Sequence, residues 1–381
     1  MKQLGIIAVA SAMGTVAVSV LAGLYGDTPD AKHAWSVHDM NRPQPPVIQA
    51  LPGQPPSDAI VLFDGTSFDN WSADNGEPTK WALKDGAMES VRGAGSIRTK
   101  QSFGDCQLHV EWASPAEVKN GGQGRGNSGV FLMGQHEVQV LDSYDSPTYP
   151  DGQAGSVYAE NPPMVNACRK PGEWQTYDII FHQPVWEGDV MKFPGSVTVL
   201  HNGVLVQDHW ELEGLSTHCQ RRPVSKYGEK GPLKFQDHGD PVRFRNIWIR
   251  EIPSRYANTT HGGPNAKEED VMALRKETAA KLFANVKLDA ENKVDTLRRM
   301  FEVVSYDTDA KYQKHVEELA GWFMDKVEKH DKAKMEELKG DIIGLRNDCN
   351  VLIRNKVLPT ENAFKAALQK LIDDHGFEKK R

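Results

Sequence analysis

Carboxylate and amide side chains gather in residues 136–144, which read HEVQVLDSY. Glu137, Gln139 and Asp142 stand at positions i, i+2 and i+5, so Glu137 and Gln139 share one face of an extended strand and Asp142 follows its end. A polar face with a carboxylate suits a sugar, because sugar hydroxyls need hydrogen-bond partners once they leave water. The same alternation is typical of the solvent-exposed outer face of an antiparallel sheet, and the pattern leaves both interpretations open.

A second polar cluster lies in residues 231–247, where Gln236 and His238 alternate with Phe235 before the chain turns at a glycine. His238 is the only side chain of this cluster that titrates near neutral pH, so it is able to donate or accept a proton. A loop histidine with aspartates beside it is more often a structural residue. That alternative also stays open.

Several chemistries lack support in this sequence. The chain has no G-x-S-x-G elbow, H-E-x-x-H helix, P-loop or dinucleotide fingerprint, which argues against serine-nucleophile, zincin and NAD chemistry. A net charge of −7 and a pI near 6.0 argue against nucleic acid as the partner. Calcium is a candidate structural ion, although no dense Asp/Asn loop identifies a site. The four cysteines include no C-x-x-C pair, and a Cys168–Cys219 disulfide stays open.

The elements that must position these residues are strands. In residues 106–112 apolar and polar residues alternate, and in residues 137–140 the alternation directs Val138 and Val140 to a core and Glu137 and Gln139 away from it. Further strands are predicted at 59–63, 127–133, 175–182, 196–200, 204–210 and 242–251. The pair Asn202-Gly203 predicts a type I′ hairpin between two of them. Residues 58–253 therefore read as an all-β domain.

The flanking regions have a different character. Residues 4–24 form an almost uncharged apolar run, so residues 1–25 are predicted to be a signal peptide or, if retained, an N-terminal membrane anchor. The protein is accordingly expected to be exported, to the periplasm or cell envelope. Residues 26–57 are rich in proline and predicted to be a solvated tether, and residues 254–266 a second linker. Residues 267–381 show helical periodicity and predict four or five amphipathic helices.

The two polar clusters belong to a wider pattern of motifs. With them go Leu62–Gly65 (LFDG), Asn70-Trp71, Gly172–Asp178 and Val197–Gln207 (VTVLHNGVLVQ). Together, and in this order, they resemble the 3-keto-disaccharide hydrolase family. The resemblance implies a mainly β fold, a concanavalin-like jelly roll of two sheets, followed here by an extra helical region. It also implies a carbohydrate substrate, a 3-keto-glycoside.

The chemistry implied by this resemblance depends on the ketone at C3, which acidifies the hydrogen on C2 of the sugar. A base removes that hydrogen, the aglycone leaves C1 by elimination, and water then adds. We assign proton transfer to Glu137 and His238, with support from Asp142. Binding of the enolate or of sugar hydroxyls is assigned to Arg125, Asn127, Gln139, Gln236 and Tyr158.

Three alternatives remain open at this stage. Glu137 and Asp142 are able to act as the two carboxylates of direct displacement, as in ordinary glycosidases. The sandwich is equally suited to a non-catalytic carbohydrate-binding module of the lectin or laminin-G type. In the third alternative the helical region docks a protein partner and carries the function, while the sandwich is structural.

Overall fold

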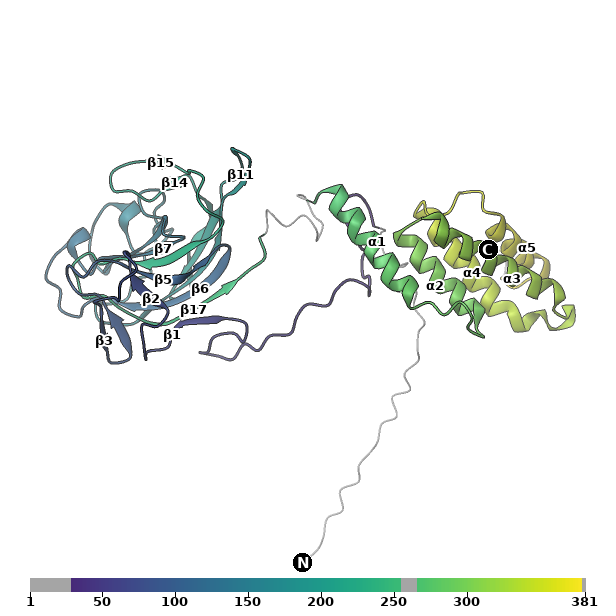
Figure 1. Ribbon diagram of the computed structural model, residues 1–381, viewed down its shortest axis with the longest axis horizontal. Helices are drawn as coiled ribbons and strands as arrows, with labels where there is room; N and C mark the ends of the chain where they lie inside the picture. The colour runs from purple at the N-terminus through teal and green to yellow at the C-terminus, as the bar shows by residue number, and fades with distance from the viewer. Residues whose placement is uncertain (1–28, 255–265, 379–381) are drawn as a thin grey trace, which may run out of the picture. The chain divides into compact units, whose positions relative to one another are not determined.

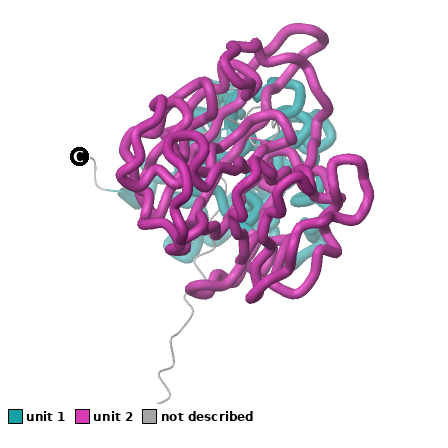
Figure 2. Tube along the Cα trace, turned by 90° about the vertical axis from the view of Figure 1, so that its left-hand side faces the viewer, with its two compact units in different colours: residues 1–45, 259–381 teal, residues 46–258 magenta. Residues whose placement is uncertain are grey.

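The computed structural model describes residues 29–254 and 266–378 of the chain (Figure 1). The chain forms two compact units, one of residues 46–258 and one that combines residues 1–45 with residues 259–381 (Figure 2). The predicted signal peptide or anchor, residues 1–25, and most of the predicted linker 254–266 lie outside the described residues. Within the described part, no helix is long and apolar enough to cross a membrane.

Two antiparallel sheets build the unit of residues 46–258. The larger sheet contains β13(Val204–Glu211), β12(Ser196–His201), β9(Gln175–His182), β6(Cys106–Ala113), β17(Arg243–Glu251), β4(Ala87–Glu89) and β3(Ala82–Lys84), in that order, with β1(Ile60–Phe63) also paired to β17. The smaller sheet contains β2(Trp71–Ala73), β5(Ile97–Phe103), β16(Gly231–Phe235), β7(Ser128–Leu132) and β8(His136–Val140). Two hairpins are separate from both sheets: β10(Val185–Glu187) with β11(Val190–Phe193), and β14(Gly214–Leu215) with β15(Arg222–Pro223).

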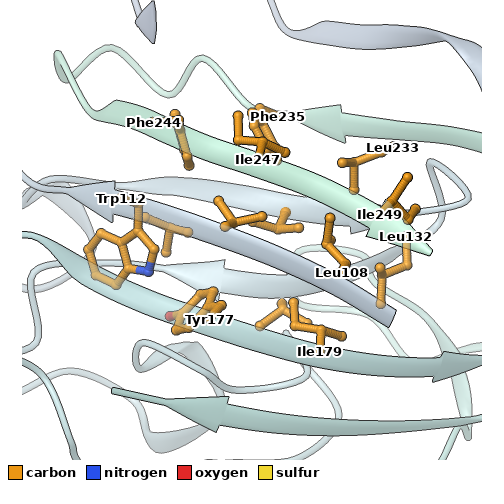
Figure 3. Close-up of a cluster of buried hydrophobic side chains, with 14 of the residues drawn as sticks. Leu108, Trp112, Leu132, Tyr177, Ile179, Leu233, Phe235, Phe244, Ile247 and Ile249 are labelled. Carbon is orange, nitrogen blue, oxygen red and sulfur yellow. The ribbon is translucent and has the colours of Figure 1, made fainter. Parts of the chain in front are cut away.

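Apolar side chains from both sheets form one core. Figure 3 shows the part of it to which the larger sheet contributes Leu108, Trp112, Tyr177, Ile179, Phe244, Ile247 and Ile249, and the smaller sheet Leu132, Leu233 and Phe235. These side chains are at most 2% exposed. Along β6 they alternate with the polar residues Gln107, His109 and Glu111, as the sequence predicts. The burial of one face of each sheet holds the two sheets together. The prediction of a mainly β, two-sheet sandwich is confirmed.

The hairpin between β12 and β13 forms at the predicted turn. His201 pairs with Val204, which leaves Asn202 and Gly203 as the two turn residues. Their φ angles are +53° and +79°. A type I′ turn requires positive φ at both positions, and asparagine and glycine tolerate this better than other residues.

Five α-helices make up most of the second unit within the described residues. They are α1(Glu268–Ala284), α2(Lys293–Tyr306), α3(Ala310–Lys329), α4(Lys339–Arg354) and α5(Ala363–His375), with a 3₁₀ segment at Lys332–Leu338. Phe301 of α2, Phe323 of α3 and Ile342 of α4 are fully buried in their common core. The predicted helical region is confirmed.

The segment before the sandwich differs in part from the predicted tether. Trp35, 8% exposed, packs in the core of the helical unit, and the Asn41 side chain donates hydrogen bonds to Glu302 Oε1 (2.7 Å) and the Tyr306 hydroxyl (3.2 Å) of α2. The Tyr306 hydroxyl in turn donates to Asp39. A tether was expected because residues 26–57 are rich in proline. Trp35 and its polar neighbours nevertheless dock part of this segment on the helices.

Candidate active site

A row of side chains crosses the smaller sheet on the face directed away from the core. Strand register pairs Lys234 of β16 with Phe131 of β7, and Phe131 with Glu137 of β8. The next segment pairs with the free edge of β8 through a bridge at Val157, and the Tyr158 backbone N–H donates to the Glu137 carbonyl oxygen at 3.0 Å. Opposed residues of adjacent strands project from the same face, so these four side chains form one row.

Glu137 is buried in this row without a hydrogen-bond partner. Its side chain is 5% exposed and its carboxylate lies over Gly129 of β7, where any Cβ would collide with Oε1. Within the described residues the carboxylate accepts no hydrogen bond. The other buried carboxylates each accept at least one; they are Asp39, Asp105, Asp142 and Glu302. Burial raises the pKa of Glu137 to about 8, although the Lys234 cation opposes the shift.

The outer face of β8 is therefore not open to solvent, and the interpretation of Glu137 and Gln139 as ordinary surface residues is wrong. Gln139 is 1% exposed. The Glu137 backbone N–H donates to Ser216 Oγ at 2.9 Å, which ties the β14–β15 connection to this edge of the sheet. Segments distant in the sequence thus cover a face that strand alternation alone marks as polar.

An amide network continues the site along β8. Gln139 Nε2 donates to Gln123 Oε1 (3.2 Å) and to Asn127 Oδ1 (3.3 Å), and Asn127 Nδ2 donates to the Gln123 carbonyl oxygen (2.7 Å). Gln139 Oε1 is buried and has no partner among the described residues. Buried acceptors without a partner are rare in folded proteins, and a ligand hydroxyl is a group that satisfies one.

Arg125 and Asp142 lie together, and apart from this row. Arg125 Nε donates to Asp142 Oδ2 at 2.6 Å, and the Asp142 side chain is 2% exposed. The pair lines a pocket of about 110 Å³ whose lining does not include Glu137. Because its charge is already compensated, Asp142 is poorly placed to act as the second carboxylate of direct displacement.

A pocket of about 280 Å³ lies beside the Glu137 row. Tyr158 of that row lines it together with Tyr149, His218 and Cys219, whereas Glu137 does not. Tyr158 Oη is 2.8 Å from His218 Nδ1 and 3.0 Å from Tyr149 Oη. The volume is near the lower end of ligand pockets, which start at roughly 300 Å³, and suits a small ligand such as one sugar ring. A larger pocket of about 520 Å³, which includes Trp186, holds none of the predicted site residues.

Gln236 and His238 occupy different positions relative to the row. The Gln236 backbone N–H donates to the Gly129 carbonyl oxygen at 3.2 Å, so Gln236 follows β16 next to the site. His238 is exposed in the loop after it, and within the described residues its ring forms no hydrogen bond or ion pair. The structure thus gathers Glu137, Gln139, Asn127, Tyr158 and Gln236 but joins His238 to none of them, and its catalytic role stays a prediction.

Three residues of the site were missed by sequence reasoning. Lys234 and Gln236 flank Phe235, so the alternation that predicts the position of Gln236 also predicts that of Lys234. Gln123 and His218 belong to segments without periodicity, so their position depends on the folded loops. No local pattern identifies them.

The cysteines and the acidic residues form no further site within the described residues. Cys168 and Cys219 are both free, so they do not form the disulfide that the sequence left open. Cys219 Sγ lies 3.2 Å from His218 Nε2. No group of three or more His, Cys, Asp or Glu side chains in the described part is arranged to hold a metal ion.

Comparison with known proteins assigns the sandwich to a family. A family model described as the 3-keto-alpha-glucoside-1,2-lyase-like domain matches residues 58–250. A Bacteroides thetaiotaomicron protein named 3-keto-disaccharide hydrolase is 27% identical over 238 residues, which are 51% of this chain and 78% of that protein.

Solved structures resemble the same region. A provisionally named glycosyl hydrolase from Parabacteroides distasonis is 44% identical, with a TM-score of 0.53, and the match covers 55% of this chain and 93% of that chain. Another from the same organism is 21% identical, with a TM-score of 0.39 and coverage of 51% and 94%. Since the family model spans half of its residues, this chain belongs to the family of 3-keto-alpha-glucoside-1,2-lyase-like domains.

Proposed function

We propose that the sandwich cleaves 3-keto-glycosides, and that Glu137 is the base that removes the hydrogen from C2 of the oxidised sugar. The family match and the name of the Bacteroides relative support the substrate class. The observation that carries the role of Glu137 is its burial without a hydrogen-bond partner in the described part of the chain, and this burial raises its pKa to about 8. A carboxyl group with this pKa exchanges its proton readily near neutral pH, as a general base must.

The reaction follows from the ketone. Once Glu137 takes the C2 proton, negative charge moves to the ketone oxygen at C3, and the resulting enolate expels the aglycone from C1. Water then adds to the C1–C2 double bond, so the net result is hydrolysis. Lys234, two strands away in the same row and paired with Asp74 at 2.9 Å, acts on the pKa of Glu137. The Gln139–Asn127 network offers polar groups to the enolate and the sugar hydroxyls.

This scheme uses one carboxylate for proton abstraction and does not need Asp142 as a nucleophile. Asp142 is bound to Arg125, and the sequence-based roles of these two residues in support and substrate binding are retained only as indirect ones. They fix the chain where β7 begins, because the Asp142 backbone N–H also donates to the Arg125 carbonyl oxygen at 3.0 Å.

The test is turnover of a 3-keto-glucoside by the purified full-length chain, followed by aglycone release and by ultraviolet absorbance of the conjugated enone. Wild type is expected to release aglycone, and Glu137→Gln to lose at least about a hundredfold in kcat. Glu251→Gln, at an exposed ion pair with Lys230, is the matched control and should resemble wild type. Unchanged turnover in Glu137→Gln would contradict the assignment, and sugar binding without any turnover would favour the non-catalytic binding module.

We propose in addition that the protein is exported to the periplasm or cell envelope through residues 4–24. Their apolar, almost uncharged composition supports this. Fractionation of cells that express the full chain should find it outside the cytoplasm, and deletion of residues 4–24 should retain it there. Docking of a protein partner by residues 267–381 stays a prediction.

A further inference from the structure

Elimination needs a proton donor as well as a base, because an alkoxide is a poor leaving group. The sequence suggests His238 for this task, but His238 contacts none of the other site residues. The row that contains Glu137 holds another group with a transferable proton. This is the phenol of Tyr158, the cross-strand neighbour of Glu137 at the edge of β8.

Backbone pairing fixes the position of Tyr158. Its N–H donates to the Glu137 carbonyl oxygen at 3.0 Å, while Val157 bridges to Val138 and faces the core, 1% exposed. Tyr158, the next residue, consequently projects from the opposite face, the one that carries the Glu137 carboxylate. Directly opposed residues have Cβ atoms about 5 Å apart, so the two side chains leave neighbouring positions on one face. The charge of Glu137 acts on the Tyr158 phenol from there.

The phenol is held at the pocket by a chain of four side chains. Tyr149 Oη lies 3.0 Å from Tyr158 Oη, Tyr158 Oη lies 2.8 Å from His218 Nδ1, and His218 Nε2 lies 3.2 Å from Cys219 Sγ. All four line the 280 Å³ pocket. They come from two connections distant in sequence, around residues 149–158 and 214–222, which meet at the edge of β8.

We propose that Tyr158 delivers the proton to the departing aglycone oxygen and that His218 is the positioning residue that supports it. This inference rests on the proposed function and assigns its missing acid. His218 acts through Tyr158: with hydrogen on Nδ1 it donates to the phenol oxygen and stabilises the phenolate that forms. In that tautomer Nε2 accepts from the Cys219 thiol, in agreement with the observed contact.

The proton balance closes within these two groups. In the elimination, the C2–H bond breaks and its proton moves to Glu137, while the C1–O bond breaks and the aglycone oxygen takes the Tyr158 proton. In the hydration, water gives its hydroxide to C1 and its proton to the Tyr158 phenolate. Glu137 then returns its proton to C2. Both residues regain their starting states, and no further reactant is required.

The electrostatics give the carboxyl group of Glu137 a lower pKa than the phenol of Tyr158. Burial, the hydrogen bond that the phenol donates to Tyr149 Oη and the charge of Glu137 all raise the pKa of Tyr158 above its ordinary value, so the phenol retains its proton at neutral pH. The titratable or charged groups around it are Glu137, Tyr149, Asp151, His218, Cys219 and Arg221. The carboxyl of lower pKa therefore acts as base and the phenol as acid.

Leaving-group dependence tests the role of Tyr158 directly. Methyl 3-keto-glucoside needs a proton on its departing oxygen, whereas 4-nitrophenyl 3-keto-glucoside releases a stable anion. Tyr158→Phe should lower kcat on the methyl glycoside by about 10²- to 10⁴-fold, and on the nitrophenyl glycoside by less than about tenfold. Glu137→Gln should lose activity on both. Tyr144→Phe is the matched control, because the Tyr144 phenol forms no hydrogen bond within the described residues, and it should resemble wild type.

His218 is tested by substitution and rescue. His218→Ala should slow the methyl glycoside about tenfold in kcat with KM unchanged, and move the pH profile of this substrate. His218→Asn should restore most of the rate, because the asparagine Nδ2 offers a donor close to the position of the imidazole Nδ1. Rates equal to wild type in His218→Ala, or no rescue by asparagine, would contradict the positioning role.

These outcomes distinguish a failure of this inference from a failure of the proposed function. If wild type is active and Glu137→Gln is not, but Tyr158→Phe slows both glycosides equally or neither, the acid is not Tyr158 and only this inference fails. This inference alone also fails if His238→Ala, and not Tyr158→Phe, slows the methyl glycoside much more than the nitrophenyl glycoside. If wild type cleaves neither glycoside, the proposed function and the inference fall together.

Discussion

The charge of Lys234 should lower the pH at which the protein becomes active, against the larger effect of burial on Glu137. Glu137 works as a carboxylate, so kcat/KM is expected to rise with pH and reach half of its plateau near pH 8, the pKa of Glu137 in the free protein. Lys234 lies in the same row with one residue, Phe131, between them, and its cation lowers this pKa. Lys234→Met removes the cation while it keeps an unbranched chain of similar length, and should therefore raise the half-point.

The size of the shift follows from the sheet. Two strand spacings separate the two positions, roughly 10 Å. At an effective dielectric constant of about 20, unit charges at that distance interact by about 1.7 kcal/mol, or roughly one pKa unit. The Lys234 side chain is 27% exposed and lies 2.9 Å from the Asp74 carboxylate, so solvent and this opposite charge make the figure an upper estimate. The half-point should move from about pH 8 to no higher than about pH 9, and kcat/KM at pH 7 should fall by up to about tenfold.

The assay is kcat/KM on 4-nitrophenyl 3-keto-glucoside between pH 6 and pH 10. Lys230→Met is the matched control. It also removes an ion-paired lysine, here paired with Glu251 as Lys234 is with Asp74, but this lysine lies just before β16 and outside the row, so the profile should overlay wild type. Profiles of Lys234→Met and wild type should converge at high pH, where Glu137 is ionised in both. A half-point that stays in place or moves to lower pH would refute the electrostatic reasoning.

Three further predictions concern stability. Because the folded-state pKa of Glu137 is raised above its ordinary 4.5, wild type loses stability as pH rises from about 4.5 to about 8, and Glu137→Gln should weaken this dependence in urea unfolding at successive pH values. Asp142→Ala leaves the Arg125 charge without its partner and should cost about 3 kcal/mol of unfolding free energy by the same method at pH 7. Trp35→Ala should lower the stability of the helical unit by about 3 kcal/mol in denaturant unfolding, with turnover by the sandwich unchanged.

The sandwich was predictable because its strands repeat a local signal. Val138 and Val140 are buried in the core as their alternation with polar residues requires, and Asn202-Gly203 makes the turn that only such residues form easily. Each of these features depends on neighbours within a few positions. A local pattern therefore carries enough information to predict them.

The environment of Glu137 was not predictable in the same way. Alternation assigned its face correctly, but Tyr158 and Ser216, which form hydrogen bonds with the Glu137 backbone, reach it from other parts of the chain. The docking of Trp35 on the helices is another contact of this kind, since nothing near Trp35 in sequence indicates its partners. Contacts between distant segments require the folded structure.

The energetics of Glu137 point to selection for activity at this position. A buried carboxyl group without a hydrogen-bond partner destabilises the fold, and an apolar side chain of similar volume would remove that cost. Gly129, on the neighbouring strand, makes room for the carboxylate, and a glycine inside a strand weakens it. Glu137 and Gly129, on neighbouring strands, thus both lower stability in order to accommodate one carboxylate. Such local conflicts with stability are expected where a protein binds or transforms a ligand, and here both conflicts have the Glu137 carboxylate in common.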